Sequence, residues 1–435
     1  MPEYERLKFF VWNNVHTLPV WQIRIWQSLH FRRLIEHAYA HIPLYRALWN
    51  ERGLTEKTVK KMRNLRLLPT VSKETFIRNT PEAYVYNYSP TYPYEWLSTS
   101  GSTGTPFRFI FPASGNGSHE IERLYIIAKR WRFLEWDGIP FNEILLTNVV
   151  KMGDRQWFDL PGIYVSTEEF RSRPKEILNE IYPLRAKAIF GFVSKIIEFC
   201  SAIRERNMVG VISFPYCSTT GEVLTQDQRN FIRDTLSCDV YDRYATTELR
   251  TIGIECREHK GFHLSSESLI LEVVDERGNS LPPNTEGKIV VTNLFNKIMP
   301  FIRYETGDRG AILSKKCPCG LATQLFSVAG RRRTIRFGTK NLYYGDLNGL
   351  ISKHVNAILQ WQVKKLSEKH AEFIFVKGKT YTLSTERQVF KALERLLGKE
   401  MRIDMRAVSN MQLTTAGKTD IFIDASKSES SMPQH

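Results

Sequence analysis

Apolar positions recur every three or four residues along the first part of the chain. Between residues 21 and 51 aromatic side chains and leucines follow this spacing, which predicts helices with one face in a core. The basic stretch 55–66 also has a helical pattern, and it is followed by the Leu-Pro pair 68–69. We expect this amino-terminal part to be a helical packing platform.

Further along, short apolar runs alternate with amphipathic stretches. The runs that predict strands lie at 143–150, 188–192, 211–215 and 240–244. Helical patterns over 194–206 and 225–236 lie between them. Because a helix after a strand brings the chain back across the sheet, this alternation predicts an α/β fold with a parallel sheet. From residue 269 the runs come closer together, and turn residues at 275–279 and 282–287 predict an antiparallel meander.

A domain boundary is expected at Gly330, just before three consecutive arginines. Residues 1–330 would form a large amino-terminal domain, and residues 331–435 a small α+β domain. The small domain is expected to contain two strands and a helix, near 372–376, 402–408 and 385–397. It holds 19 Lys and Arg against 10 Asp and Glu, so most of the excess positive charge lies in this last quarter.

The charge balance points to an anionic partner without identifying it. The 435 residues include 61 Lys and Arg against 46 Asp and Glu, a formal net charge of +15. Nucleic acid would suit this excess, but a solvated cationic surface has the same composition. With 42% hydrophobic residues, the composition is that of a globular protein and excludes a largely disordered chain.

Six cysteines are too few for a disulfide framework in a chain of this length. The first residues do not resemble a signal peptide. No apolar run approaches the ~18 residues that a membrane-spanning helix needs. We therefore expect a cytoplasmic protein with reduced thiols.

The clearest local motif is the segment Ser-Thr-Ser-Gly-Ser-Thr-Gly-Thr-Pro at 98–106. Small hydroxyl residues and glycines let a loop bring several N–H and O–H donors onto phosphate oxygens. The segment is not a Walker A loop, because Gly104 is followed by Thr-Pro and not by Lys-Ser. A flexible Ser/Gly turn is the alternative interpretation.

Three other stretches carry candidate chemistry. Tyr244-Ala-Thr-Thr-Glu248 combines an aromatic face, two hydroxyls and a carboxylate that could hold Mg²⁺. Asp308 ends a Tyr-Glu-Thr-Gly-Asp turn and could accept hydrogen bonds from a ribose diol. Lys418 lies in a polar turn near the carboxyl terminus, where it could bring one cation into a site. Taken singly, each stretch has a purely structural alternative.

Together, in this order, the motifs resemble the ANL superfamily of adenylate-forming enzymes and most closely its phenylacetate-CoA ligase-like branch. That branch includes capsule-locus homologues, active in capsule polysaccharide biosynthesis, and an adenylyltransferase of a deazaflavin coenzyme. The resemblance extends almost end to end, from the helical segment 31–45 through Ser218–Glu222 to the Thr-Ala-Gly-Lys motif at 415–418. It implies a large adenylation domain followed by a mobile lid domain that carries the adenylation lysine.

The resemblance also implies a role for each motif residue. The ATP phosphates would be bound by Ser100, Gly101, Ser102, Thr103 and Gly104. Adenine and ribose would be bound by Gly221, Glu222, Tyr244, Asp308 and Arg331, with Tyr244 stacking on the base. Thr247 would contact the α-phosphate, Glu248 would hold Mg²⁺, and Lys418 would bridge the carboxylate and the α-phosphate. The aspartate usual at the hinge of the family is Arg333 here, which puts the domain-rotation cycle in question.

A second constellation consists of sulfur and nitrogen ligands. Cys256 and His263 are followed, about fifty residues later, by Cys317 and Cys319, a set that suits a closed tetrahedral Zn²⁺ site. His259 is a rival third ligand, and reduced structural cysteines are the alternative. The phenylacetate-CoA ligase branch has a similar pair of motifs. A Zn²⁺ ion here would be structural.

The expected function is ATP-dependent activation of a carboxylic acid as acyl-AMP, followed by transfer to CoA or an amine. The alternatives are AMP transfer to a hydroxyl or phosphate of a coenzyme or saccharide, and an inactive basic binding protein on the same scaffold. The expected partners are a small carboxylic acid, with an aromatic acid as one candidate, and a CoA, amine or amino-sugar acceptor. Aromatic candidates for the acid pocket are Trp131, Phe133, Trp136, Phe190, Phe192 and Tyr216.

Overall fold

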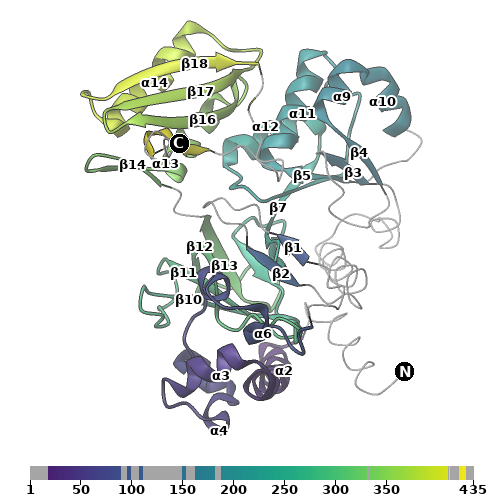
Figure 1. Ribbon diagram of the computed structural model, residues 1–435. Helices are drawn as coiled ribbons and strands as arrows, with labels where there is room; N and C mark the ends of the chain where they lie inside the picture. The colour runs from purple at the N-terminus through teal and green to yellow at the C-terminus, as the bar shows by residue number, and fades with distance from the viewer. Residues whose placement is uncertain are drawn as a thin grey trace. The chain divides into compact units, whose positions relative to one another are not determined.

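The computed structural model describes residues 18–89, 96–98, 107–110, 149–152, 162–181, 188–330, 334–409, 411 and 421–427. The chain divides into two compact units, one of residues 1–141 and 243–331, the other of residues 142–242 and 332–435. The fold is mixed α/β, which confirms the predicted class (Figure 1). The division into domains at Gly330 stays a prediction.

The first unit begins with a helical layer. Its elements are α2 (Val20–His41), α3 (Pro43–Asn50), α4 (Glu56–Val59), η1 (Met62–Leu67), α5 (Lys73–Ile77) and α6 (Pro81–Tyr84). The helical prediction for 21–51 is confirmed, while the stretch predicted at 55–66 is split into α4 and η1. Helix α2 ends where Pro43 follows, and Pro43 then occupies the first turn of α3, where its missing N–H costs nothing.

An antiparallel sheet forms the rest of this unit. Its strands are β7 (Asp239–Thr246, with residues 243–246 in this unit), β8 (Arg250–Glu255), β9 (Phe262–Leu264), β10 (Leu269–Val274), β11 (Gly287–Asn293), β12 (Tyr304–Ile312) and β13 (Leu325–Gly330). They follow one another in the order β10-β11-β12-β13-β9-β8-β7, and the meander expected from residue 269 is confirmed. Asp275 Oδ1 closes the first turn by accepting from the backbone N–H groups of Arg277 and Asn279, at 2.9 and 2.8 Å.

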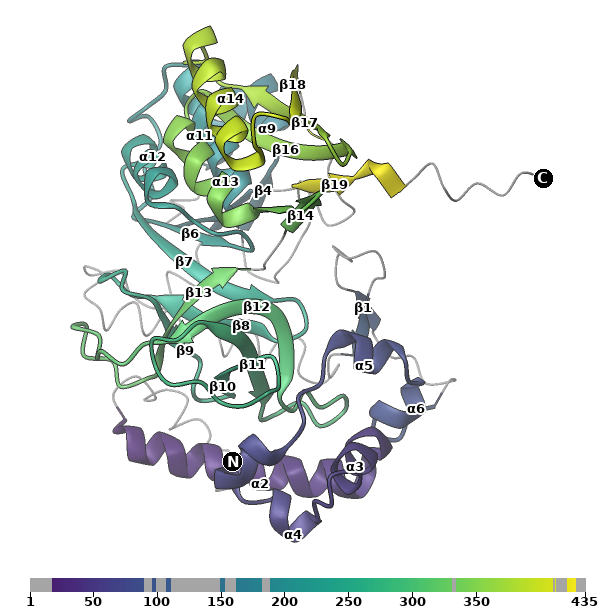
Figure 2. The same ribbon diagram turned by 90° about the vertical axis from the view of Figure 1, so that its left-hand side faces the viewer.

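Helix α2 lies along the outside of this sheet (Figure 2). Trp26 Nε1 donates to the carbonyl of Glu267 at 2.8 Å, and Gln27 Nε2 donates to the carbonyls of Ser266 and Leu269 at 3.0 and 2.9 Å. The side chains of α3, α5 and the strands join one hydrophobic core. Polar anchors inside an apolar contact fix the position of the helix, because an unpaired buried group would be costly.

The second unit contains a parallel sheet with helices. Its first elements are β3 (Val149–Met152), β4 (Gly162–Val165), α9 (Thr167–Ser172), α10 (Pro174–Ile181), β5 (Ala188–Phe192), α11 (Val193–Glu205), β6 (Tyr216–Thr220) and α12 (Gln226–Leu236). The order β6-β5-β3-β4 is parallel throughout, which confirms the predicted sheet type. Thr225 caps α12 by accepting from Gln228 N at 3.3 Å.

One strand prediction in this unit is wrong. Residues 211–215 form no strand, and the strand begins only at Tyr216. Ile212 and Phe214 pack into the core around α11 and α12, although Ile212 forms only an isolated bridge, with Val209. Pro215 has no N–H to give to a ladder, and the strand accordingly starts after it. Of the strand predicted at 143–150, residues 143–148 lie outside the described residues.

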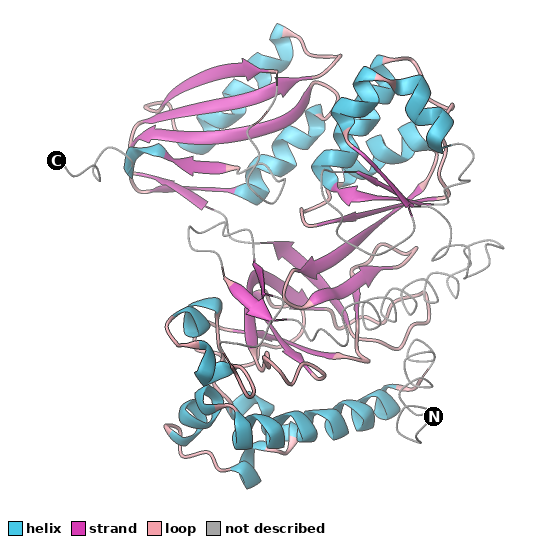
Figure 3. Cartoon of the chain, turned by 45° about the vertical axis from the view of Figure 1, so that its right-hand side comes forward, coloured by secondary structure: helices cyan, strands magenta, loops and turns pink. Residues whose placement is uncertain are grey.

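The carboxyl-terminal part of the same unit has its own core. Its elements are β14 (Thr334–Phe337), β15 (Lys340–Tyr343), α13 (Tyr344–Ile351), η4 (Ser352–His354), β16 (Ile358–Ser367), β17 (His370–Lys377), α14 (Leu383–Leu397), β18 (Arg402–Val408), β19 (Phe422–Asp424) and η5 (Ala425–Lys427). The sheet order is β18-β17-β16-β19. Helices α13 and α14 pack on one face of it (Figure 3). Among the helices in the described ranges, none combines the length and apolar character needed to cross a bilayer.

Tyr45 offers a test of how the helical layer is attached to the sheet. Its side chain is 1% exposed, and its hydroxyl donates to the carbonyl of Pro300 at 2.7 Å and accepts from Ile302 N at 3.0 Å. Tyr45→Phe should lower the free energy of unfolding by about 1–3 kcal/mol, because both backbone groups lose their partner. Chemical denaturation measures this, with Tyr39→Phe as the control, since that hydroxyl bonds to Asn50 at an exposed position. Equal effects of the two substitutions would contradict the prediction.

Candidate functional site

Glu248 lies in the tight turn that joins β7 to β8. Its side chain is 4% exposed, and its Oε1 accepts a hydrogen bond from the hydroxyl of Tyr304 at 3.0 Å. The half-buried Thr247 precedes it, and Leu249 N donates to Thr246 Oγ1 at 3.2 Å, which holds the turn. The turn thus presents a buried anion, the kind of oxygen ligand that Mg²⁺ takes.

Asp308 lies in a β-bulge of strand β12. Glu305 pairs with Val290, whereas Arg309 pairs with Lys288, so β12 has extra residues opposite β11 at this point. Gly307 has φ +81°, a conformation that glycine adopts without steric cost. Asp308 is 8% exposed, between the exposed Gly307 and the half-buried Arg309, so the bulge keeps its carboxylate on the same buried side as Tyr304 and Thr306.

The hydroxyl of Tyr244 donates to Asp308 Oδ2 at 2.8 Å and lies 3.1 Å from Thr306 Oγ1. Asp308 N also donates to Thr306 Oγ1, at 3.2 Å. Both tyrosines belong to the hydrophobic core of the first unit, and each holds one of the two carboxylates. Strands β7 and β12 therefore bring together Tyr244 with Asp308, and Glu248 with Tyr304. This arrangement orients two acceptors that suit a cation and a sugar diol.

In the second unit, Glu222 has a structural contact. It follows β6 and Gly221, which has φ +77°. Its carboxylate accepts from the backbone N–H and the hydroxyl of Ser194, at 2.7 and 2.9 Å. Ser194 lies in the first turn of α11, so Glu222 satisfies one N–H group that the helix leaves unpaired there. The adenine-binding role of Gly221 and Glu222 stays a prediction.

Several predicted site residues lie outside the described residues. These are Ser100, Gly101, Ser102, Thr103, Gly104, Arg331 and Lys418, together with the pocket candidates Trp131, Phe133 and Trp136. The proposed phosphate loop connects β1 (Trp96–Ser98) and β2 (Arg108–Ile110), which pair with Ser98 opposite Arg108. Of the remaining pocket candidates, Phe190 and Tyr216 are buried and Phe192 half-buried on the neighbouring strands β5 and β6. Their role toward an acid stays a prediction.

The predicted cysteine and histidine cluster is assembled in the first unit. One ligand atom from each of Cys256, His263, Cys317 and Cys319 lies within 4.8 Å of the others, and all four residues are buried. Within the group, Cys256 Sγ lies 3.4 Å from Cys317 Sγ, and Cys319 Sγ lies 3.3 Å from His263 Nε2. The rival ligand His259 is not part of the group; its Nδ1 lies 3.3 Å from Glu255 Oε2.

The donor set fits a tetrahedral Zn²⁺ site. Zn–S bonds of about 2.3 Å and Zn–N bonds of about 2.0 Å place ligand atoms about 4 Å apart, so the four atoms, all within 4.8 Å of one another, lie close to the separations that a bound ion needs. His263 Nδ1 lies 3.2 Å from Thr323 Oγ1, which leaves Nε2 for the metal, the usual support of a metal-bound imidazole. Cys319 and burial raise the pKa of Cys256 to about 12, and a bound cation would reverse this by stabilising the thiolate.

The chain is similar in sequence to one CoA ligase and in fold to others. No model of a known protein family matches the chain. The chain is 22% identical to phenylacetate-coenzyme A ligase of Thermus thermophilus over 332 residues, which are 71% of this chain and 69% of the relative. Its structure is similar to that of a 2-hydroxyisobutyryl-CoA ligase in the postadenylation state, with a TM-score of 0.72, 15% identity and coverage of 94% and 91% of the two chains. An anthranilate CoA ligase, AuaEII, in complex with anthranoyl-AMP has a TM-score of 0.52 at 12% identity, with coverage of 75% and 65%.

The protein is thus an α/β protein with the fold of the adenylate-forming ligases. Its sequence is similar to that of a phenylacetate-CoA ligase and its fold to those of two further CoA ligases, which agrees with the resemblance to the ANL superfamily that its motifs carry. Sequence reasoning missed two residues that contact the candidate site residues. Tyr304 is next to the predicted turn but has no assigned role until its contact with Glu248 is seen. Ser194 carries no motif at all and contacts Glu222 from a helix 28 residues earlier in the chain.

Proposed function

We propose that this protein joins a carboxylic acid to CoA at the expense of ATP. A carboxylate oxygen attacks the α-phosphate and forms acyl-AMP while pyrophosphate leaves. The CoA thiolate then attacks the acyl carbon, and AMP leaves with the bond electrons. The observation that carries the proposal is the pair of buried carboxylates, Glu248 and Asp308, each held by a tyrosine hydroxyl. Two fixed anions at the end of β7 and on the bulge of β12 suit the Mg²⁺ and the ribose of a nucleotide.

We assign the chain's own residues to these steps by their motifs. Glu248 would hold Mg²⁺, which neutralises charge on the phosphates, and Asp308 would accept from the ribose hydroxyls with Tyr244 as its support. The phosphate oxygens would be bound by the loop residues Ser100 to Gly104 and by Thr247. Such chemistry needs little bond-making by the protein, because positioning and charge neutralisation supply most of the rate. Gly221, Glu222 and Arg331 complete the proposed nucleotide-binding set.

The names of the similar proteins support CoA as the acceptor. All three are CoA ligases, and two of the solved structures contain an acyl-adenylate. The basic carboxyl-terminal part suits the CoA phosphates, although an amine, an amino sugar or a capsule precursor would use the same first half-reaction. A screen of pyrophosphate release over a panel of acids, with CoA and amines added in turn, identifies both substrates. Formation of a stable adenylated product without acyl transfer would favour the AMP-transfer alternative.

Glu248→Gln tests the central assignment. The amide keeps the shape of the side chain but removes the charge that would hold Mg²⁺, so acid-dependent pyrophosphate release should fall on the order of a hundredfold or more. The circular dichroism spectrum should not change, because Tyr304 can still donate to the amide oxygen. The matched control is Glu276→Gln, at a side chain that is 71% exposed. Undiminished pyrophosphate release in the Glu248 variant would show that the motif assignment is wrong.

Lys418 is predicted to separate the two half-reactions. Its ammonium would bridge the carboxylate and the α-phosphate, two anions that otherwise repel each other. Lys418→Ala should slow acyl-AMP formation on the order of a hundredfold or more and leave acyl transfer from synthetic acyl-AMP to CoA largely intact. The exposed Lys399→Ala is the control for a general loss of positive charge. If both half-reactions fail together, or neither does, the bridging role is refuted.

We also propose that Cys256, His263, Cys317 and Cys319 bind a structural Zn²⁺ ion. The four buried ligand atoms lie within 4.8 Å of one another and connect the turn after β8, strand β9 and the turn between β12 and β13. A metal that joins three segments in this way would hold the meander in place.

Metal analysis of protein purified without added zinc should find about one equivalent per chain, because a closed Cys₃His site binds zinc tightly. Cys317→Ser should lower both the zinc content and the melting temperature. Cys200→Ser, at a buried thiol of the second unit that is not one of the four ligands, should keep the full zinc content. Metal-free wild-type protein with an unaltered melting temperature in the Cys317 variant would refute the site.

A further inference from the structure

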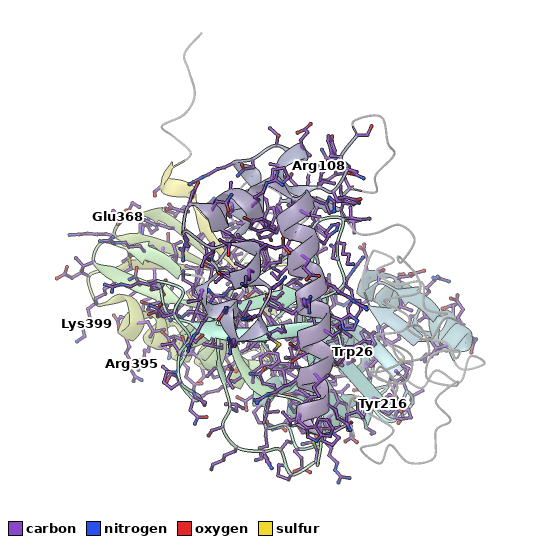
Figure 4. The ribbon with its side chains drawn as sticks, turned by 90° about the horizontal axis from the view of Figure 1, so that it is seen from below. Trp26, Arg108, Tyr216, Glu368, Arg395 and Lys399 are labelled. Atoms are coloured by element: carbon purple, nitrogen blue, oxygen red, sulfur yellow. The ribbon has the colours of Figure 1, made fainter. Side chains whose placement is uncertain are left out.

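Helix α2 has a second face that the sheet does not use. Its buried side includes Ile23, Trp26 and Leu34, which are at most 4% exposed. The opposite side presents Trp21, 61% exposed, and Ile25, also 61% exposed. Figure 4 shows the molecule from the side on which α2 lies, and the helix crosses the front of that view. A large indole in water is unusual for a residue with no structural task.

The exposed apolar side chains form one stripe. Trp21, Ile25 and Leu29 follow one another at four-residue intervals, and Leu29 is 39% exposed. Residues four apart are neighbours on a helix surface, so the stripe is about 12 Å long at a rise of about 1.5 Å per residue. Contiguous exposed apolar residues of this kind mark interaction surfaces more often than scattered ones do.

Cations flank the stripe on both sides. At about 100° per residue, Arg24 lies about 60° before Trp21 around the helix axis, and Arg33 lies about 40° beyond Leu29. Both are exposed, as is Arg32, which pairs with Glu36 at 2.9 Å. Between Glu5 and Glu36 the sequence contains no acidic residue at all. The face is therefore apolar along its middle and positive along its edges.

We propose that this face of α2 docks onto an anionic phospholipid surface. A straight helix on the outside of a unit is convex, and a bilayer accepts a convex ridge without needing a matching groove. The indole, isoleucine and leucine would enter the boundary between headgroups and acyl chains, while the arginines contact lipid phosphates. A second copy of the chain fits less well, because a two-fold axis through the face would set its arginines against one another.

Co-sedimentation of the full chain with vesicles tests the proposal. Vesicles of phosphatidylcholine with about a third phosphatidylglycerol should retain at least ten times more protein than vesicles of phosphatidylcholine alone, since both charge and apolar burial contribute. The triple variant Trp21→Gln/Ile25→Gln/Leu29→Gln and, separately, Arg24→Gln/Arg33→Gln should each lose most of this binding. The control Leu383→Gln/Arg387→Gln places the same changes on the exposed side of α14 and should bind as wild type does.

Circular dichroism spectra and melting temperatures of all variants should match those of the wild type, because the changed side chains lie in solvent. Failure to bind anionic vesicles, or equal binding by the triple variant, overturns the proposal. A wild-type dimer that the triple variant converts to a monomer in light scattering would assign the face to a second copy and would also overturn it. Because vesicle binding is independent of pyrophosphate release, this result is separable from a failure of the proposed ligase activity.

Discussion

A buried guanidinium, that of Arg303, is the interaction on which the first unit depends. Its side chain is 1% exposed and donates to both carboxylate oxygens of Glu272, at 3.0 and 3.2 Å. It also donates to the backbone carbonyls of Arg66, Leu68 and Gly278. Burial raises the pKa of Glu272 even though the guanidinium opposes this, which shows how strongly the site excludes water. A buried guanidinium is costly unless all its N–H groups are hydrogen-bonded. Arg303 therefore holds the segments around Leu68 and around Glu272 and Gly278 against the start of β12.

The position of the candidate site follows from that contact. Arg303 directly precedes Tyr304, has φ +49°, and its backbone carbonyl accepts from Val71 N at 3.0 Å. The start of β12 is therefore held on both edges before the bulge at Gly307 begins. Tyr304 and Asp308 occupy defined places relative to the β7–β8 turn because β12 cannot slide. The contacts of Arg303 thus help to orient the carboxylates of Glu248 and Asp308, although Arg303 itself has no part in the proposed chemistry.

The hydrophobic pattern of a segment predicted its helix or strand correctly where the residues of that segment determine the structure. The capped helix α12, strand β5 and the meander from β10 onward follow the predicted pattern closely. Prediction failed at 211–215, where apolar side chains are buried although their backbone forms no strand. Sequence reasoning also gave Glu222 only a nucleotide-binding role. It missed the hydrogen bonds from Glu222 to the start of α11, because these depend on the packing of β6 beside that helix. The spacing of apolar residues indicates which side chains are buried, but it does not specify which backbone groups form hydrogen bonds.

By itself the sequence determined the fold class and the chemical groups available, since hydrophobic period and residue type are local properties. It did not determine which of these groups meet. Only the tertiary structure selected His263 over His259 for the Cys cluster and gave Glu248 its contact with Tyr304, 56 residues away. The physical reason is that such contacts depend on strand order and on the register shift at the bulge. Both are set by packing and by buried charge over the whole unit, and neither leaves a pattern in neighbouring residues.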